Sequence, residues 1–344
     1  MNLDRTDFIR AMLAEDWGPD APVAHLEPLP RLSDDAADEA SRSLAALGAA
    51  ELLVALDRTV SNVIEQHGAA GSARLWGVLG SREAVASSHI ENEGTSLALG
   101  DMRREIELMR FPNAHGVDVQ TEAEIEEGHW LAGEKTSVLR CSGASRWLLT
   151  SGVSLYNTLR AHGILCFGRQ EVKPGQVRRD GDRVVIGDGR GGVSFAPPLG
   201  GPEIKEMLRD LVDWVSDRCN QQKADDQLEQ YAYRVAVSGI AHLRFETIHP
   251  FLDGNGRTGR SFAEAIIAST RPHHHHVLPI GIAMAFSDRI QRSTYYAALD
   301  HGRQNQTEFA VWWCEHVEEA AKMAIEEIET DGCFDALAAG EAPA

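Results

Sequence analysis

The sequence has few cysteines and no long hydrophobic run. Five cysteines are spread over 344 residues without a CxxC pair, which disfavours a disulfide framework and a zinc knuckle. No apolar stretch reaches the roughly 18 residues of a membrane-spanning helix, and the first twenty residues carry acids where a secretory signal needs a basic end. We therefore expect a cytoplasmic protein that does not associate with membranes.

Basic charge is also scarce. Asp and Glu outnumber Lys and Arg by 52 to 33, which gives a formal net charge of −19. Such a chain repels nucleic acid phosphates as a whole, and no Lys/Arg-rich block offers a local basic face. We therefore exclude nucleic acid as a partner. The hydrophobic content of 43% is typical of a globular protein with a large core.

Helical periodicity covers most of the chain. Apolar residues recur at three- and four-residue steps from about Leu47 to His67, and Ser81 is a candidate N-cap for a second helix that runs to Glu91. Further helical patterns occupy 99–110, 121–139, 145–165, 202–221, 227–250, the segment after 256, and 307–329. The exception is 174–198, where an Asp180-Gly181 turn between short strand-like runs predicts a β-hairpin. The predicted fold is mainly α with one small hairpin.

The string HPFLDGNGRTGR, residues 249–260, places glycine and charge at the entrance of an apolar helix. The first N–H groups of a helix have no partner within it, and glycines on both sides of Asn255 let this backbone approach a ligand closely. With the helix dipole behind it, the Gly254 to Gly256 segment suits a diphosphate. Arg257 and Arg260 lie on one helical face and would add charge-assisted bonds to further phosphates.

Two further side chains flank this anion nest. Asp253 can bind Mg²⁺ that bridges the phosphates. His249 is neutral near pH 7 and could remove a proton from an attacking hydroxyl. Together these residues predict nucleotide activation and transfer to a hydroxyl. Each element by itself also has an ordinary interpretation, because a lone GxG is usually a turn and Arg260 could pair with Glu264.

The complete string resembles the signature of the Fic family, HPFx(D/E)GNGRxxR. Every defining position is present: His249, Pro250, Phe251, Asp253, Gly254, Asn255, Gly256, Arg257 and Arg260. The resemblance extends over about residues 75–325. It implies a Fic-type helical bundle with an N-terminal arm and helix (1–70), a helical region (71–140) that contains an inhibitory helix at about 81–92, a Fic core (141–328) and a disordered tail (329–344).

The resemblance implies transfer of AMP from ATP to a Ser, Thr or Tyr hydroxyl of a target protein, with automodification and release of pyrophosphate. His249 would be the base and Asp253 the Mg²⁺ ligand. Asn255 and its glycines would stabilise the growing α-phosphate charge, while Arg257 and Arg260 would hold the outer phosphates.

The resemblance also assigns two surfaces. Tyr295 and Tyr296 are candidates for the adenine pocket, although tyrosines on a buried helix face are more often plain core, and Asn305 is a weaker candidate. The hairpin at about 176–194 would be a flap that pairs with the target by strand addition. Family members often form dimers, so a homodimer is one expectation.

A second string, SSHIEN at 87–92, resembles the inhibitory motif (S/T)xxxE(G/N) of the family, with Ser87, Glu91 and Asn92 at the defining positions. Its place upstream of the core implies the class with an N-terminal inhibitory helix. A Glu91 carboxylate that reached Arg260 would occupy the guanidinium that the γ-phosphate needs, so the resting enzyme would be nearly silent.

Other interpretations stay open. On the same fold, Glu91 could position a water that removes AMP from a modified target, or another nucleotide or phosphate group could be transferred. The intact Gly254 and Gly256 argue against the kinase-like branch of the family. A helical interaction module without activity is the remaining alternative. The four histidines at 273–276 lack the spacing of a metal site, which favours a solvated loop.

Overall fold

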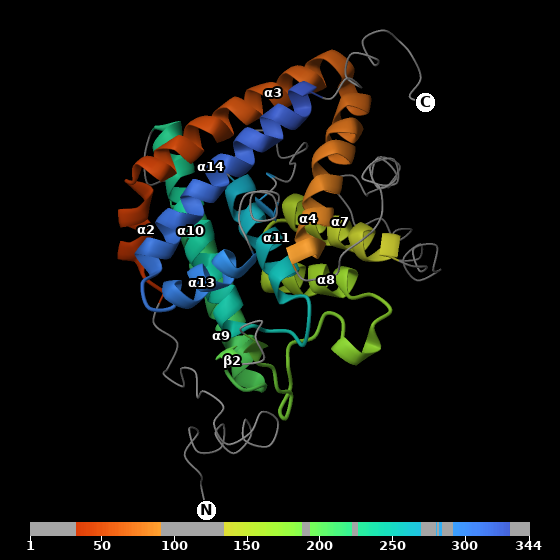
Figure 1. Ribbon diagram of the computed structural model, residues 1–344, viewed down its shortest axis with the longest axis vertical. Helices are drawn as coiled ribbons and strands as arrows, with labels where there is room; N and C mark the ends of the chain where they lie inside the picture. The colour runs from red at the N-terminus through yellow and green to blue at the C-terminus, as the bar shows by residue number, and fades with distance from the viewer. Residues whose placement is uncertain are drawn as a thin grey trace, which may run out of the picture.

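The computed structural model describes residues 32–90, 134–187, 193–221, 226–269, 280, 282–283 and 292–330. Helices dominate these residues (Figure 1). They are α2 (Asp34–Ser41), α3 (Leu44–Leu75), a π-helix (Trp76–Gly80), α4 (Ser81–Ile90), α7 (Glu134–Ser151), α8 (Leu155–Leu165), a 3₁₀ turn (Gln170–Val172), α9 (Pro202–Asn220), α10 (Gln227–Ile248), α11 (Asn255–Ala268), α13 (Arg292–Gly302) and α14 (Gln306–Thr330). The strands are β1 (Ile186–Gly187) and β2 (Val193–Phe195). The predicted mainly α fold with one small hairpin is confirmed.

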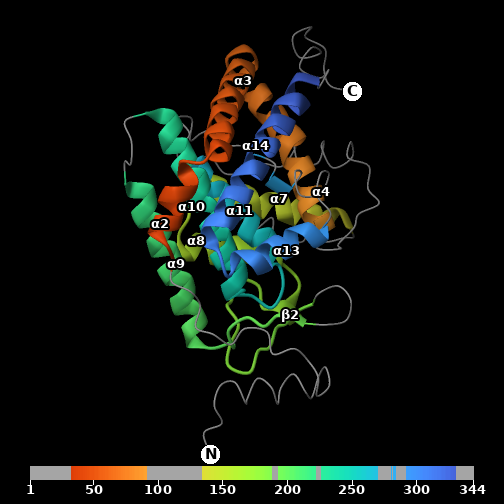
Figure 2. The same cartoon turned by 60° about the vertical axis from the view of Figure 1, so that its left-hand side comes forward.

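Helix α10 forms the centre of the fold, because nearly all of its residues from Tyr231 onward are buried. It contacts α2, α3, α9, α11 and α14, and α3 lies along α14 in both views (Figures 1 and 2). A glycine allows α14 to approach closely, since a Cβ at Gly239 would meet Trp313 Cγ at 2.8 Å. The indole Nε1 of Trp313 donates to Ser238 Oγ at 2.9 Å, which satisfies its one polar atom inside the core.

The chain leading into α4 differs from the prediction. Helix α3 extends beyond the predicted 47–67, bends at Gly68 (φ 57°, ψ −134°) and continues through the π-helix directly into α4. Ser81 is therefore not an N-cap, and that prediction is wrong. Its N–H bonds back to Val78 O, and its Oγ donates to the same carbonyl at 3.1 Å. A residue that continues a preceding helix has no unpaired N–H groups to cap.

The hairpin is present, but its turn lies elsewhere. Strands β1 and β2 pair antiparallel with Ile186 opposite Phe195, so the turn falls within 188–192, outside the described residues. The prediction of a turn between the strands at Asp180-Gly181 is wrong. Those residues belong to a separate turn in the segment before β1, where Asp182 Oδ2 accepts from the Arg179 N–H at 2.7 Å. Lys173 Nζ pairs with Asp182 Oδ1 at 2.7 Å and fixes this turn.

The helical pattern at 145–165 is two helices rather than one. Gly152 has φ 75°, and Ser154 accepts from the Asn157 N–H at 3.0 Å as the N-cap of α8. The predicted helices at 99–110 and over most of 121–139 lie outside the described residues, as do residues 1–31 of the N-terminal arm, the histidines at 273–276 and residues 331–344 of the C-terminal tail. Within the described part of the chain, no helix is long and apolar enough to cross a membrane.

Candidate active site

The loop after α10 carries His249 in a left-handed backbone conformation, with φ 49° and ψ 63°. Positive φ is uncommon for a residue other than glycine, and a buried arginine holds the loop in place. Arg178 Nε donates to His249 O at 2.8 Å, and its Nη2 donates to Ile248 O at 3.1 Å. The Arg178 N–H donates to Pro250 O at 2.8 Å. Arg178, in the segment before the hairpin, thus fixes where α10 ends.

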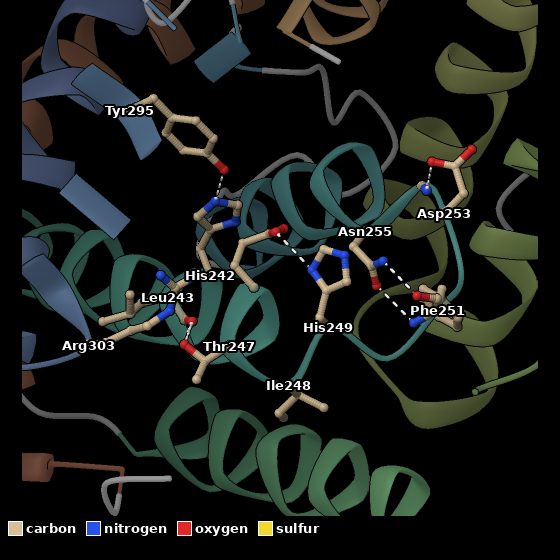
Figure 3. Close-up of polar contacts among 12 residues, drawn as sticks. His242, Leu243, Thr247, Ile248, His249, Phe251, Asp253, Asn255, Tyr295 and Arg303 are labelled. Atoms are coloured by element: carbon tan, nitrogen blue, oxygen red, sulfur yellow. Dashed lines mark hydrogen bonds and ion pairs between the residues drawn. The ribbon is translucent and has the colours of Figure 1, made fainter. Parts of the chain in front are cut away.

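The glycine nest follows at the start of α11. Gly254 is the N-cap with φ 78°, and a Cβ there would meet Leu165 Cδ2 at 3.0 Å. The side chain of Asn255 closes the loop on itself, because its Oδ1 accepts from the Phe251 N–H and its Nδ2 donates to Phe251 O, both at 2.9 Å (Figure 3). The backbone of Asn255 and Gly256 is therefore the part that can bind an anion at this helix end.

A buried histidine, His162, holds the signature loop through its ring nitrogens and by stacking. His162 Nδ1 accepts from the Gly175 N–H at 3.0 Å, and its Nε2 lies 3.0 Å from Asp253 O. Because the backbone N–H is a donor, the neutral ring carries its proton on Nε2 and donates it to Asp253 O. The ring also stacks on Phe251 with centroids 3.7 Å apart. His162 thereby joins α8, the segment before the hairpin and the signature loop.

Asp253 is ionised in this setting. Its Oδ2 accepts from Arg169 Nη1 at 2.6 Å, and its Oδ1 accepts from the Gly254 N–H at 2.6 Å and lies 3.7 Å from Arg257 Nη2. Desolvation raises the pKa of Asp253, but the Arg257 charge and the bonds from Gly254 and Arg169 outweigh it, so the pKa lies below its usual range. The side chain is 38% exposed, so the carboxylate is accessible to a cation.

His249 is neutral in the resting protein. Burial, followed by the charges of Arg178 and Arg303, lowers the pKa of His249 to about 3. Its side chain is 16% exposed, and Nδ1 lies 3.8 Å from Glu246 Oε2; Figure 3 draws this contact as a dashed line from the His249 ring. A neutral ring can accept a proton at physiological pH.

A pocket of about 250 Å³ brings these residues together. Its walls come from the end of α10, the start of α11, residues 184–186 and α13. Both Tyr295 and Tyr296 line it with His249 and Asp253. The Tyr295 hydroxyl, however, lies in the core, 2.8 Å from Nε2 of the buried His242. Asn305 is not among the lining residues; its Oδ1 accepts from the Glu308 N–H at 3.2 Å at the start of α14.

The second half of the signature is buried. Arg257 and Arg260 do not line the pocket, and Arg260 is 0% exposed. Arg260 Nε donates to Ser87 Oγ at 3.0 Å, and its Nη2 donates to Ser87 O at 2.9 Å. Ser87 of the SSHIEN string therefore holds Arg260 from α4. Glu91 and Asn92, which follow in that string, lie outside the described residues.

Comparison with known proteins agrees with this geometry. Residues 153–267 match the model of the Fic/DOC family. This segment is similar to a Fic domain. The protein adenylyltransferase fic-1 of Caenorhabditis briggsae is 31% identical over 160 residues, which cover 43% of this chain and 28% of that protein. The Caenorhabditis elegans protein of the same name is 30% identical over the same share of each chain. The match spans less than a third of the length of these relatives.

Solved structures share the fold of a larger part of this chain than residues 153–267. A Fic family protein from Desulfovibrio desulfuricans superposes with a TM-score of 0.51 at 21% identity, covering 89% of this chain and 78% of that one. A Fic domain containing protein from Bacteroides thetaiotaomicron gives 0.53 at 14% identity, covering 86% and 98%. Identities this low establish the fold alone.

Several residues around the Fic domain signature were missed by sequence reasoning. Arg178 and His162 fix the loop, Arg169 holds Asp253, and Glu246 and Arg303 line the pocket beside His249. Arg178 lies in the segment before the hairpin, and the sequence assigned this residue no role. His162 and Glu246 lie in ordinary helical segments, and Arg169 and Arg303 lie in the loops that follow α8 and α13. No local pattern marks these residues, and all but Glu246 reach the site from segments far away in the chain.

Proposed function

We propose that this protein transfers AMP from Mg-ATP to a Ser, Thr or Tyr hydroxyl of a target protein, itself included, and that helix α4 restrains the reaction. The observation that carries the proposal is a pocket in which His249, Asp253 and the start of α11 meet within a segment that is similar to a Fic domain. The names of the two fic-1 relatives support an adenylyltransferase activity.

The pocket suggests how ATP would lie. The phosphates would bind at the N-terminus of α11, where the free N–H groups and the helix dipole favour negative charge. The adenine ring would then lie toward α13, against Tyr296 and Leu299, which form the apolar part of the wall. This orientation places the α-phosphate beside His249.

The reaction then needs one base and one anion site. The target hydroxyl oxygen attacks the α-phosphorus, its proton passes to His249 Nε2, and pyrophosphate leaves as the new P–O bond forms. The backbone N–H groups of Asn255 and Gly256 stabilise the charge that grows on the α-phosphate oxygens. The side chain of Asn255 contributes by holding the loop closed around Phe251.

Asp253 would hold Mg²⁺. Its carboxylate is ionised and accessible, and Mg²⁺ is usually bound by one or two carboxylates together with substrate phosphates and water. A single carboxylate beside a phosphate site fits that pattern. When bound, the ion would neutralise charge on the leaving pyrophosphate. Arg169 holds Asp253 Oδ2 at 2.6 Å and so fixes the direction of the carboxylate.

The contact between α4 and α11 supports autoinhibition. Arg260 is needed for the outer phosphates, and in the resting protein its guanidinium is bound to both Ser87 Oγ and Ser87 O. In our proposal, Glu91 adds a carboxylate to this contact from the next turn of the inhibitory motif. ATP would then bind in a geometry unsuited to in-line attack until α4 moves.

The hairpin supports the proposed docking of the target. Val184, Val185 and Ile186 line the same pocket as His249, and Ile186 begins strand β1. A target segment that pairs as an added strand along 176–194 would therefore present its hydroxyl close to the base.

The proposal is tested by incubating the Glu91→Gly protein and host lysate with ATP labelled at either the α- or the γ-phosphate. We expect α-label in target proteins and in the protein itself, and no γ-label. The same incubation with Glu91→Gly/His249→Ala should give no labelled band. Transfer of γ-label alone would show phosphorylation instead. No label, together with an unchanged melting temperature in Mg-ATP, would indicate the interaction module.

A further inference from the structure

His249 needs a partner on the nitrogen that does not face the substrate. A neutral imidazole carries one proton, so Nε2 can act as the base only if the proton lies on Nδ1. Glu246 Oε2 lies 3.8 Å from His249 Nδ1, and both residues line the pocket. The backbone carbonyl of Glu246 also acts on the ring and raises the pKa of His249, against the larger effect of burial. Nδ1 itself is buried and has no hydrogen-bond partner among the described residues, so Glu246 is the residue that offers acceptors on this side.

The position of Glu246 is tightly specified. It lies on the last turn of α10 and is buried against α11, where a Cβ at Gly259 would meet its Oε1 at 2.6 Å. Any side chain at position 259 would displace the carboxylate from the neighbourhood of His249. Gly259 occupies a position that the signature HPFx(D/E)GNGRxxR leaves open, so the signature alone does not specify this packing.

The positive charge that His249 would acquire during transfer needs a negative charge nearby, and the Glu246 carboxylate can supply it. When Nε2 takes the hydroxyl proton, the ring becomes an imidazolium close to Arg178 and Arg303, and both of these repel a positive charge. The charge of Asp253 raises the pKa of the ring, and Glu246 Oε2 lies 3.8 Å from Nδ1. Asp253 is engaged by Arg169 and would hold Mg²⁺. The charge of Glu246 also acts on Arg303, so it would offset both the imidazolium and the guanidinium that repels it.

We propose that Glu246 is a positioning residue for His249, which keeps the ring proton on Nδ1 and offsets the imidazolium charge during transfer. This inference rests on the proposed function, because it gives His249 the role of base. The hydroxyl proton moves to Nε2, the bond from the hydroxyl oxygen to the α-phosphorus forms, and the bond to pyrophosphate breaks. The 3.8 Å separation is long for a hydrogen bond, as is common before substrate binds.

Kinetics on Glu246→Gln in the Glu91→Gly background test the charge. Loss of the orienting carboxylate of a catalytic triad costs about 10⁴-fold, and because the backbone carbonyl survives here we expect a smaller fall in kcat, roughly 10- to 1,000-fold. KM for ATP and the calorimetric affinity for Mg-ATP should not change. Glu246→Asp restores the charge and should recover part of the rate. Glu229→Gln, the same change at an exposed position of α10, is the matched control.

The ring proton gives a readout that needs no turnover. Nitrogen-15 NMR of the wild-type imidazoles should show the His249 proton on Nδ1. A proton on Nε2, or a Glu246→Gln enzyme with unchanged kcat, would overturn the inference. Equal losses in Glu246→Gln and Glu246→Asp with weakened Mg-ATP binding would also overturn it, since they would indicate packing alone. His249→Ala separates the two proposals: if it still labels targets, the proposed function fails, whereas an inactive His249→Ala beside an active Glu246→Gln removes only Glu246.

Discussion

The two halves of the 249–260 signature have different surroundings. His249 and residues 252–256 open onto the pocket, and their loop is fixed by Arg178 and His162. Arg257 and Arg260 are buried beneath the helices, and Arg260 is bound to Ser87 of α4. The residues that would catalyse transfer are therefore already assembled around the pocket, while Arg257 and Arg260, which would hold the outer phosphates, are covered. Restraint then acts on nucleotide geometry rather than on the base.

Removing the base should have the largest effect. In the Glu91→Gly background, His249→Ala should lower AMP transfer by roughly 10²- to 10⁴-fold, because general-base catalysis is lost. Mg-ATP affinity, measured by calorimetry, should stay near that of the parent, since the nest is made by α11. His301→Ala, at an exposed histidine of α13, serves as the control. Near-normal labelling by His249→Ala would remove His249 from the mechanism.

Loss of the metal ligand should come next. We expect Asp253→Ala to lower transfer by about 100-fold and to abolish its dependence on Mg²⁺, because a metal ion supplies several kcal/mol of charge stabilisation. A Mg²⁺ titration of the initial rate measures this dependence. Asp217→Ala, at an exposed position of α9, should titrate like the parent. An Asp253→Ala protein with the parental Mg²⁺ response contradicts the assignment.

A smaller change in Mg-ATP affinity should follow from a substitution at the contact between Ser87 and Arg260. Ser87→Ala removes the acceptor of Arg260 Nε but keeps Ser87 O as the acceptor of Nη2. We expect Mg-ATP affinity to rise by about three- to tenfold as the guanidinium is partly released, with a loss of roughly 1.5–3 kcal/mol in unfolding free energy. Ser88→Ala tests the adjacent buried serine, whose hydroxyl has no hydrogen-bond partner among the described residues. Equal effects of the two variants would show that the Arg260 contact has no regulatory role.

The smallest expected change concerns pH. Burial and the charges of Arg178 and Arg303 lower the pKa of His249 to about 3, against smaller opposing effects from the Glu246 backbone and the Asp253 charge. The neutral base therefore predominates at every pH well above 3, and kcat/KM should show no acid limb near the ordinary histidine pKa of about 6.5. A bell-shaped profile with a limb at that pH would contradict the stated environment.

The same shifts affect stability. Burial lowers the folded-state pKa of both His249 and His242 to about 3, so between pH 6.5 and 3 the unfolded chain binds protons that the folded protein does not. Unfolding free energy should therefore be greatest above pH 6.5 and fall as the pH is lowered through this window. Denaturant titrations at pH 7.5 and 5 measure the difference, and equal values at both would show that these rings are not shielded.

The sequence predicted the parts of the site that are contiguous. His249, Asp253 and the Gly254 to Gly256 segment are adjacent in the chain, and a helix start needs no tertiary information to suggest an anion site. The helical bundle and the hairpin also followed from periodicity. Tyr295 and Tyr296 line the pocket, and their predicted contact with adenine stays a prediction; the Tyr295 hydroxyl belongs to the core.

The remaining features depend on long-range contacts. Arg178 and His162 reach the signature loop from segments far away in the chain, and no local pattern marks them. The Asp180-Gly181 pair is a strong local turn signal, but the bond from Lys173 to Asp182 places that turn before the hairpin. Ser81 has the chemistry of an N-cap, and only the continuous helix in front of it shows that no cap is required.

The central claim is that Arg260 is withheld from ATP in the resting protein and is the group on which activation depends. A double-mutant comparison of α-label transfer tests it with wild type, Glu91→Gly, Arg260→Ala and Glu91→Gly/Arg260→Ala. The account predicts a gain of roughly 10- to 100-fold for Glu91→Gly, equivalent to about 1.4–2.8 kcal/mol, and loss of that gain in the double variant. A Glu91→Gly protein that labels no better than wild type, or a double variant that keeps the full gain, would contradict it.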